Sequence, residues 1–167
     1  LKCVKNNEKD KNSLNDKIIN ILNKINENNI EIIGNKLFNL LFIGELNDII
    51  ANEYTLIEII IEKILMNNYN SSIYSQLCEL LYGYLERNIN ITKQSHNTEN
   101  LKTILYQELT MNFENNLKNE NKEKIIKLIS FINKLTIEKF LTVIETFYFY
   151  DSLIKKYIEI NNIEEKL

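Results

Sequence analysis

The chain of 167 residues has no proline, no tryptophan and only three glycines. β-Sandwiches and β-barrels place glycine and proline at many tight turns, so this composition argues against a turn-rich β fold. A nucleotide-binding fold is disfavoured as well, because its phosphate loop needs clustered glycines. No apolar run approaches the roughly 20 residues that a membrane-spanning helix requires. The sequence therefore predicts neither a β fold nor a membrane partner.

Chemically reactive side chains are also scarce. His96 is the only histidine, and a Ser-His-Asp or Cys-His arrangement would have to recruit it from a polar stretch without activating neighbours. Cys78 falls on the apolar side of its segment, so we expect a buried structural thiol, and we expect Cys3 to be incidental. Zinc-ligand spacing and calcium loops are missing. We therefore predict a non-enzymatic protein that needs no metal and no cofactor.

The charge balance is slightly acidic. The net charge is −3, and Arg87 is the single arginine among 20 basic residues. A strongly basic nucleic-acid footprint is thus absent from the chain as a whole. Lysine can still contact phosphate as a point charge, although bidentate clamping by arginine is scarce.

Two clusters invite a chemical interpretation. Asp48, Glu53, Glu58 and Glu62 crowd one stretch, but a di-metal carboxylate site uses Glu-x-x-His pairs and no histidine is available, so we expect a solvated helix face. The aromatic run 147–150 covers all sides of a helix end. Because no lysine interleaves this run, core packing is favoured over a base-stacking platform.

Apolar residues recur at helical spacing along almost the whole chain. Leu14, Ile18 and Leu22 mark one stripe, after a candidate N-cap at Ser13. Thr55 and Glu58 match a capping box, which predicts a helix start there. The predicted helices are about eight, over residues 13–28, 30–50, 55–67, 72–88, 99–118, 122–134, 137–149 and 151–161.

Short links between these helices predict antiparallel hairpins. We expect a frayed segment over residues 1–12 and one helical-repeat domain over residues 13–167, which we expect to be the N-terminal part of a longer domain. Polar breaks are predicted at 88–100 and 118–122. A pair-to-pair spacing of about 40–50 residues is in the range of HEAT-type repeats. The fold class is therefore all-α, an α-solenoid of HEAT-like hairpins, although periodicity supports a closed helical bundle nearly as well.

The segment Ser72–Cys78 has the sequence Ser-Ile-Tyr-Ser-Gln-Leu-Cys. It is similar to a signature of the form Ser-Met-Tyr-Ala-Gln-Leu-Cys in the middle domain of eukaryotic translation initiation factor 4G, and the chain resembles that domain over roughly residues 17–155. Weaker similarities lie at Ile61–Lys63, Ile21–Ile25, Leu101–Glu114 and Phe131–Leu135. The chain departs from the family where Asn26-Glu27 replaces the usual Thr-Pro, and at Asn133-Lys134.

The resemblance implies a cytoplasmic scaffold of translation initiation. Family members hold the DEAD-box RNA helicase factor 4A in a productive state and contact messenger RNA and other initiation factors. Carried over by motif, the helicase-binding surface would include Leu22, Ile25 and Ile30. Leu22 and Ile25 also lie on the predicted core stripe, and periodicity alone favours core packing for both. Both roles are compatible if the first hairpin ends the solenoid, where part of the stripe is uncovered.

Contact with RNA is a weaker expectation. Lys17, Lys24 and Lys36 lie near the first hairpin, and the segment 122–127 carries a second lysine cluster. Such clusters are usually solvated faces. Two other functions stay open: the same domain type serving nuclear mRNA processing, nonsense-mediated decay or cap binding, and a helical interaction module without any connection to RNA.

Overall fold

The structure, a computed structural model, describes residues 14–42, 46–66, 71–88 and 99–164. All regular secondary structure in these ranges is helical, and they contain no strand. The first helix covers residues 14–22. The others are α2 (Ile30–Leu41), α3 (Leu46–Met66), α4 (Ser71–Asn88), α5 (Glu99–Lys118), α6 (Lys122–Ile137) and α7 (Val143–Glu164). None of these described helices is both long and apolar enough to cross a bilayer.

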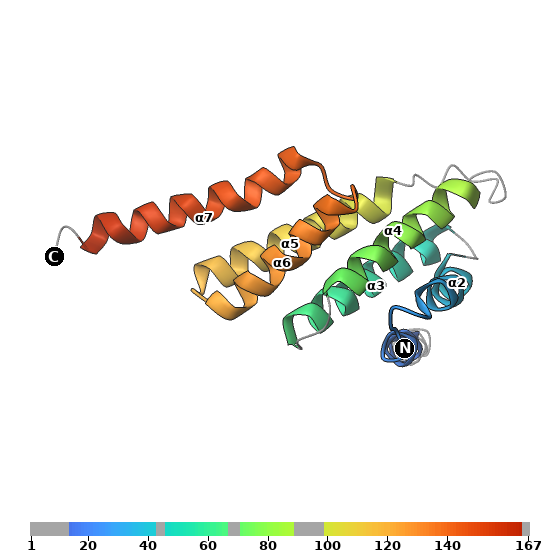
Figure 1. Cartoon of the computed structure of the whole chain (residues 1–167). Coiled ribbons are helices and arrows are strands. Elements are labelled where there is room, and N and C mark those ends of the chain that lie inside the picture. The colour runs from blue at the N-terminus through green and yellow to red at the C-terminus, as the bar shows by residue number, and fades with distance from the viewer. Residues whose placement is uncertain (1–13, 43–45, 67–70, 89–98, 165–167) are drawn as a thin grey trace, which may run out of the picture.

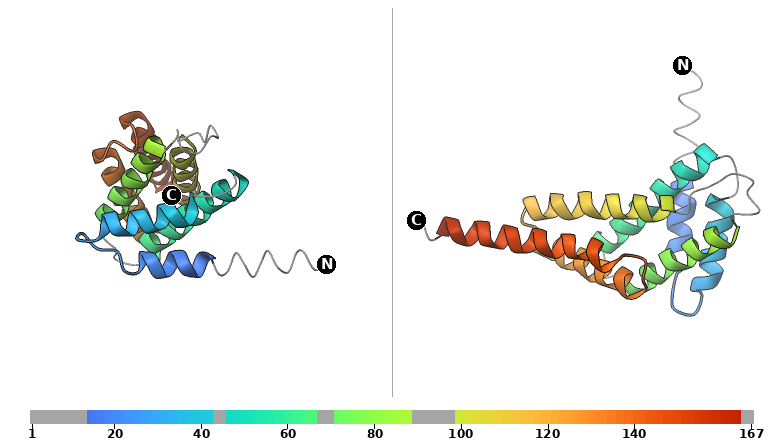
Figure 2. Two further views of the ribbon diagram at one scale, coloured as in Figure 1. Left: turned by 90° about the vertical axis from the view of Figure 1, so that its right-hand side faces the viewer. Right: turned by 90° about the horizontal axis from the view of Figure 1, so that it is seen from above.

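The helices stack in two rows. Helices α2, α4 and α6 pack side by side in one row, and α3, α5 and α7 pack in the other, with α6 also touching α3, α5 and α7. Figure 1 shows α3, α5 and α7 running in one direction and α4 and α6 in the opposite one. The first helix and α2 form an antiparallel hairpin at one end of the stack, and α7 lies at the other end (Figure 2). The all-α helical-repeat prediction is confirmed.

Several predicted boundaries are wrong. The helix expected over residues 13–28 ends at residue 22. The helix expected over residues 30–50 ends at Leu41, and residues 46–50 belong to α3. Thr55 is therefore in the interior of α3, where its hydroxyl donates to the carbonyl of Ala51 at 3.0 Å instead of capping a helix. The two helices expected over residues 137–149 and 151–161 form the single helix α7. The helix count within the described residues is seven, not eight.

The true capping box of this region begins α7. The backbone N–H of Glu145 donates to the hydroxyl of Thr142 at 3.2 Å, and the Glu145 carboxylate accepts from the backbone N–H of Thr142 at 2.7 Å. This reciprocal arrangement satisfies two amide groups that a helix start otherwise leaves without partners. It fixes where α7 begins.

Helix α3 has neighbours in both rows, α5 in its own row and α2 and α6 in the other. The β-branched run 57–61 could be mistaken for a strand, yet it is helical, and four of its five residues are buried because α3 has neighbours on several sides. Glu58 is its exposed exception. The prediction that this run continues a helix is confirmed. The predicted caps and loops at Ser13 and 89–98, and the segment 1–12, lie outside the described residues.

Helices α2 and α4 approach closely at a glycine. A Cβ atom placed on Gly34 would lie 2.5 Å from Cδ2 of Leu80, whereas one on Gly83 would meet nothing nearer than an Arg87 guanidinium nitrogen at 3.9 Å. Gly34 is therefore a packing requirement of the α2–α4 contact.

Gly34→Leu should lower the free energy of unfolding by about 1–3 kcal/mol, because the added side chain overfills a packed helix contact. Gly83→Leu is the matched control, since both changes replace glycine in a helix interior and gain similar helix propensity. Urea titrations followed by circular dichroism measure both. Equal shifts for the two variants would contradict the packing role.

Candidate partner-binding surface

The turn between the first helix and α2 is built from asparagine side chains. Asn29 accepts from the backbone N–H of Asn26 at 2.8 Å, and its own amide donates to the carbonyl of Lys24 at 2.8 Å. Asn26 accepts in turn from the backbone N–H of Asn28 at 3.0 Å. Asparagine suits such turns because its short amide can replace backbone hydrogen bonds. The turn therefore has a defined shape although it lacks the proline of the family pattern.

A long side chain ties this turn to the body of the protein. The ammonium group of Lys63, on α3, donates to Oδ1 of Asn23 at 2.5 Å. Asn23 stands directly after the first helix. The end of the first helix is thus fixed against α3, which places the turn at the edge of the stack.

The structure corrects one predicted contact residue and leaves two in place. Leu22 has an exposed fraction of 0% and packs in the core, so it offers no surface to a partner, and its assignment to the helicase-binding surface is wrong. Ile25 and Ile30 are half-buried against the core. These two side chains flank the asparagine turn, one at its start and one at the first residue of α2.

Sequence reasoning missed a third apolar side chain close by. Ile32, in the first turn of α2, is 59% exposed. The sequence pattern could have predicted this exposure. The buried stripe of α2 consists of Ile33, Leu37 and Leu41, and Ile32 does not lie on it.

The lysines predicted near the first hairpin are accessible. Lys17, Lys24 and Lys36 are all exposed, and Lys24 lies within the asparagine turn. A small basic and apolar surface, formed by Lys24, Ile25 and Ile30 and here named the hairpin surface, therefore occupies this end of the stack.

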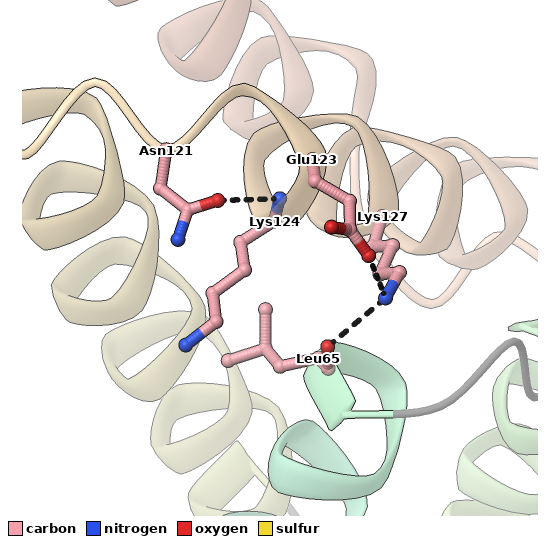
Figure 3. Close-up of polar contacts among 5 residues, drawn as sticks. All are labelled: Leu65, Asn121, Glu123, Lys124 and Lys127. Atoms are coloured by element: carbon pink, nitrogen blue, oxygen red, sulfur yellow. Dashed lines mark hydrogen bonds and ion pairs between the residues drawn. The ribbon is translucent and has the colours of Figure 1, made fainter.

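The second lysine cluster serves the fold. Lys127 donates to the carbonyl of Leu65 in the last turn of α3 at 3.2 Å and pairs with Glu123 at 2.7 Å (Figure 3). Asn121 caps α6 by accepting from the backbone N–H of Lys124 at 3.2 Å. A lysine that satisfies a helix C-terminal carbonyl stabilises that terminus. Lys127 thus joins α6 to α3, and the expectation of a plain solvated face does not hold for it.

The acidic stretch divides between the core and a shallow pocket. Glu53 is fully buried, which contradicts the expected solvated face at that position. Glu58 and Glu62 line a cavity of about 240 Å³ between α3, α5 and α6, together with Glu108 and Lys124. No group of metal-binding side chains occurs among the residues that the structure describes.

The surroundings of this pocket raise the pKa of one carboxyl group, that of Glu108. Burial raises the pKa of its carboxyl group above the ordinary value, and the negative charge of Glu58 raises it further. Because its pKa is raised in the folded state, ionised Glu108 lowers the free energy of unfolding at neutral pH. This loss of stability disappears as the pH falls below the ordinary pKa of a glutamate side chain. The pocket thus brings three carboxyl groups together, with the ammonium group of Lys124 in the same lining.

The reactive residues of the chain show no catalytic arrangement in the described ranges. Cys78 is buried, as predicted, and burial raises the pKa of its thiol to about 12. Tyr74, Ser75 and Leu77 of the Ser72–Cys78 block are buried too, whereas Gln76 is exposed. The segment most similar to the factor 4G family is therefore a packing block. His96 and Cys3 lie outside the described residues.

The aromatic run splits between the two faces of α7. Phe149 is fully buried and meets Phe113 edge-on at a centroid distance of 5.2 Å. Phe147 is 64% exposed, and Tyr148 and Tyr150 are partly exposed. Core packing is thus confirmed for Phe149 alone.

Comparison of the chain with models of known protein families, with curated proteins and with solved structures found no match.

Cys78 should be inert towards thiol reagents in the native protein. With a pKa near 12, almost none of it is thiolate at neutral pH, and its burial blocks access. In a Cys3→Ser background, an aromatic disulfide reagent should release chromophore only at the rate of unfolding. Rapid release without denaturant, with unchanged circular dichroism, would contradict the buried-thiol assignment.

Proposed function

We propose that this protein is a non-enzymatic helical-repeat scaffold of the factor 4G middle-domain type, which acts in cytoplasmic translation initiation. In this proposal the hairpin surface binds the DEAD-box RNA helicase factor 4A, other initiation factors bind elsewhere on the stack, and messenger RNA is contacted weakly. The proposal rests on the sequence resemblance together with the geometry of the first hairpin.

The observation that carries the proposal is the asparagine turn with its flanking isoleucines. A partner-binding surface needs apolar side chains that are partly accessible and held in a fixed position, so that little conformational entropy is lost on binding. Ile25 and Ile30 are half-buried, and hydrogen bonds through Asn26 and Asn29 define the turn between them. The resemblance points to the same turn, which gives two independent reasons to consider it.

The segment Ser72–Cys78, which is most similar to the factor 4G family, lies largely in the core, so this similarity supports the fold more than the choice of partner. Tyr74, Leu77 and Cys78 are core residues, and core residues specify a fold shared by domains with different partners. The same fold acting in nuclear mRNA processing, nonsense-mediated decay or cap binding therefore remains the second candidate. A helical interaction module without an RNA connection is the third.

Ile25→Asp and Ile30→Asp should each weaken helicase binding at least about tenfold, because a charge replaces an apolar contact at the centre of the surface. Pull-down and titration with purified factor 4A measure the loss, and circular dichroism verifies the fold. Ile126→Asp is the matched control, since Ile126 is 69% exposed on α6, away from the turn.

The result separates the three candidates. Loss of binding in the turn variants alone supports the initiation scaffold. A wild-type chain that ignores factor 4A but retains a nuclear RNA-processing helicase supports the second function. Failure to bind any helicase removes the proposed function. Leu22→Asp is unsuitable as a probe, because a charge at a fully buried site should unfold the first hairpin.

RNA binding by the lysines of the first hairpin should be weak and should fall steeply with salt, because lysine–phosphate contacts release counterions. Filter binding of single-stranded RNA across a salt series measures the slope. Lys17→Ala, Lys24→Ala and Lys36→Ala should each reduce the slope by about one if the lysine contacts phosphate. Lys118→Ala, an exposed lysine on α5, is the control. Tight binding that survives high salt would contradict this mechanism.

A further inference from the structure

A shallow groove crosses α3 between the first helix and α5. It consists of two pockets that share Glu62 and Met66 in their linings and are therefore continuous. The cavity of about 240 Å³ between α3, α5 and α6 is here named the acidic pocket. The second cavity, of about 200 Å³, lies between the first helix and α3 with Ile19 and Ile59 in its lining, and is here named the apolar pocket.

Three carboxyl groups gather in the acidic pocket. Glu58 and Glu62 come from α3, and Glu108 comes from α5. Within the ranges that the structure describes, none of the three carboxylates forms a hydrogen bond or an ion pair. Lys124 lines the same pocket, but its ammonium group pairs with none of them. The acidic pocket therefore holds more negative than positive charge.

This arrangement differs from the pairing of charges on other helices. On α6, Glu123 pairs with Lys127 at 2.7 Å, and α7 contains a carboxylate–lysine pair of the same sequence spacing at 2.6 Å. On α3, the residue four positions after Glu58 is another acid, Glu62. Like charges at this spacing repel one another on a helix surface. A positive charge from a partner would supply the pairing that α3 lacks here.

Glu108 is a carboxylate that a cation would stabilise. Burial raises the pKa of its carboxyl group, and the negative charge of Glu58 raises it further. Both effects disfavour the ionised form. A positive charge placed within a few ångströms would favour the ionised form again, because opposite charges attract strongly in a partly desolvated site. The acidic pocket is therefore electrostatically complementary to a cationic group.

The geometry favours a guanidinium group over a metal ion or a nucleic acid. No cluster of side chains suited to holding a metal ion occurs in the described part of the chain. A guanidinium group has five N–H donors spread over a planar fork, so it can reach carboxylates that do not meet at one point. A nucleic acid is disfavoured, because the carboxylates repel its phosphates.

The sizes of the two pockets fit single side chains. Each is smaller than the roughly 300–1,000 Å³ of a typical small-molecule site. Ile61 and Leu65 line the acidic pocket beside its carboxylates, so the methylene groups of a long cationic side chain have apolar surface to contact. Ile19 and Ile59 provide an apolar lining in the adjoining pocket.

We propose that this groove binds an arginine-containing segment of a partner protein, with a guanidinium group in the acidic pocket and a neighbouring apolar side chain in the apolar pocket. The proposal does not depend on the helicase hypothesis, because the groove shares no residue with the hairpin surface. A second copy of this chain is not the occupant. Its single arginine, Arg87, donates from Nε to the carbonyl of Gly83 at 3.0 Å and lies 5.0 Å from the ring centroid of Tyr84.

A fluorescent peptide of alternating arginine and leucine should bind the full chain, as measured by fluorescence anisotropy at low ionic strength. The same peptide with citrulline in place of arginine should bind at least about tenfold more weakly, because citrulline keeps the shape of arginine and loses its charge. No binding of the arginine peptide, or equal affinity for the two peptides, overturns the proposal.

A double variant, Glu58→Gln with Glu108→Gln, should weaken binding of the arginine peptide at least about tenfold with unchanged circular dichroism. The matched control is Glu79→Gln with Glu86→Gln, which removes two exposed carboxylates from α4 and should bind as the wild type does. An equal loss in the control would show that the peptide is attracted to the acidic chain as a whole, and would refute the groove.

Met66→Ser and spermine separate a peptide site from a polyamine site. Met66 lines both pockets and is 66% exposed, so its truncation should weaken binding of the arginine peptide about threefold. Spermine carries positive charge without apolar side chains. If spermine binds as tightly as the peptide and Met66→Ser has no effect, the peptide assignment is wrong. Ile25→Asp should leave peptide binding unchanged, so that this result is distinct from the helicase test.

Discussion

The stability of this molecule depends on burying more than one apolar side of most of its helices. Helix α3 shows the requirement most clearly, because Ile59, Ile60 and Ile61 are consecutive and all buried, which no single neighbouring helix can achieve. Hairpins stacked in two rows satisfy this requirement, since α3, α5 and α6 each have neighbours in both rows and α4 packs between α2 and α6. The helices at the two ends necessarily have fewer neighbours, so exposed apolar surface collects there.

Local patterns in the sequence predicted correctly which segments are helical, but they did not predict where each helix begins and ends. The pattern Thr-x-x-Glu occurs at Thr55–Glu58 and at Thr142–Glu145, and only the second is a capping box. The difference lies in what precedes each pattern. Residues 46–54 form helix, and Ile49 and Glu53 are buried, so the helix continues through Thr55. In contrast, α6 has already ended at Ile137 before Thr142. Tertiary packing therefore decided a choice that the four-residue pattern left open.

The candidate site illustrates a second limit of sequence reasoning. Periodicity placed Leu22 in the core and the resemblance placed it on a binding surface; the structure agrees with periodicity. Ile25, one turn further along, is only half-buried because the helix stops at residue 22 and the asparagine turn carries the chain away from the stripe. The end of a helix changes which side chains remain on its buried face, and that end depended on side-chain hydrogen bonds such as that from Lys63 to Asn23.

The two ends of the stack differ in chemistry, and this difference indicates different kinds of partner. The first hairpin ends in a polar asparagine turn with Lys24 beside Ile25, a combination suited to a reversible contact with a protein or a phosphate backbone. The α7 end offers a long apolar stripe with little charge, which resembles the more hydrophobic interfaces of lasting complexes.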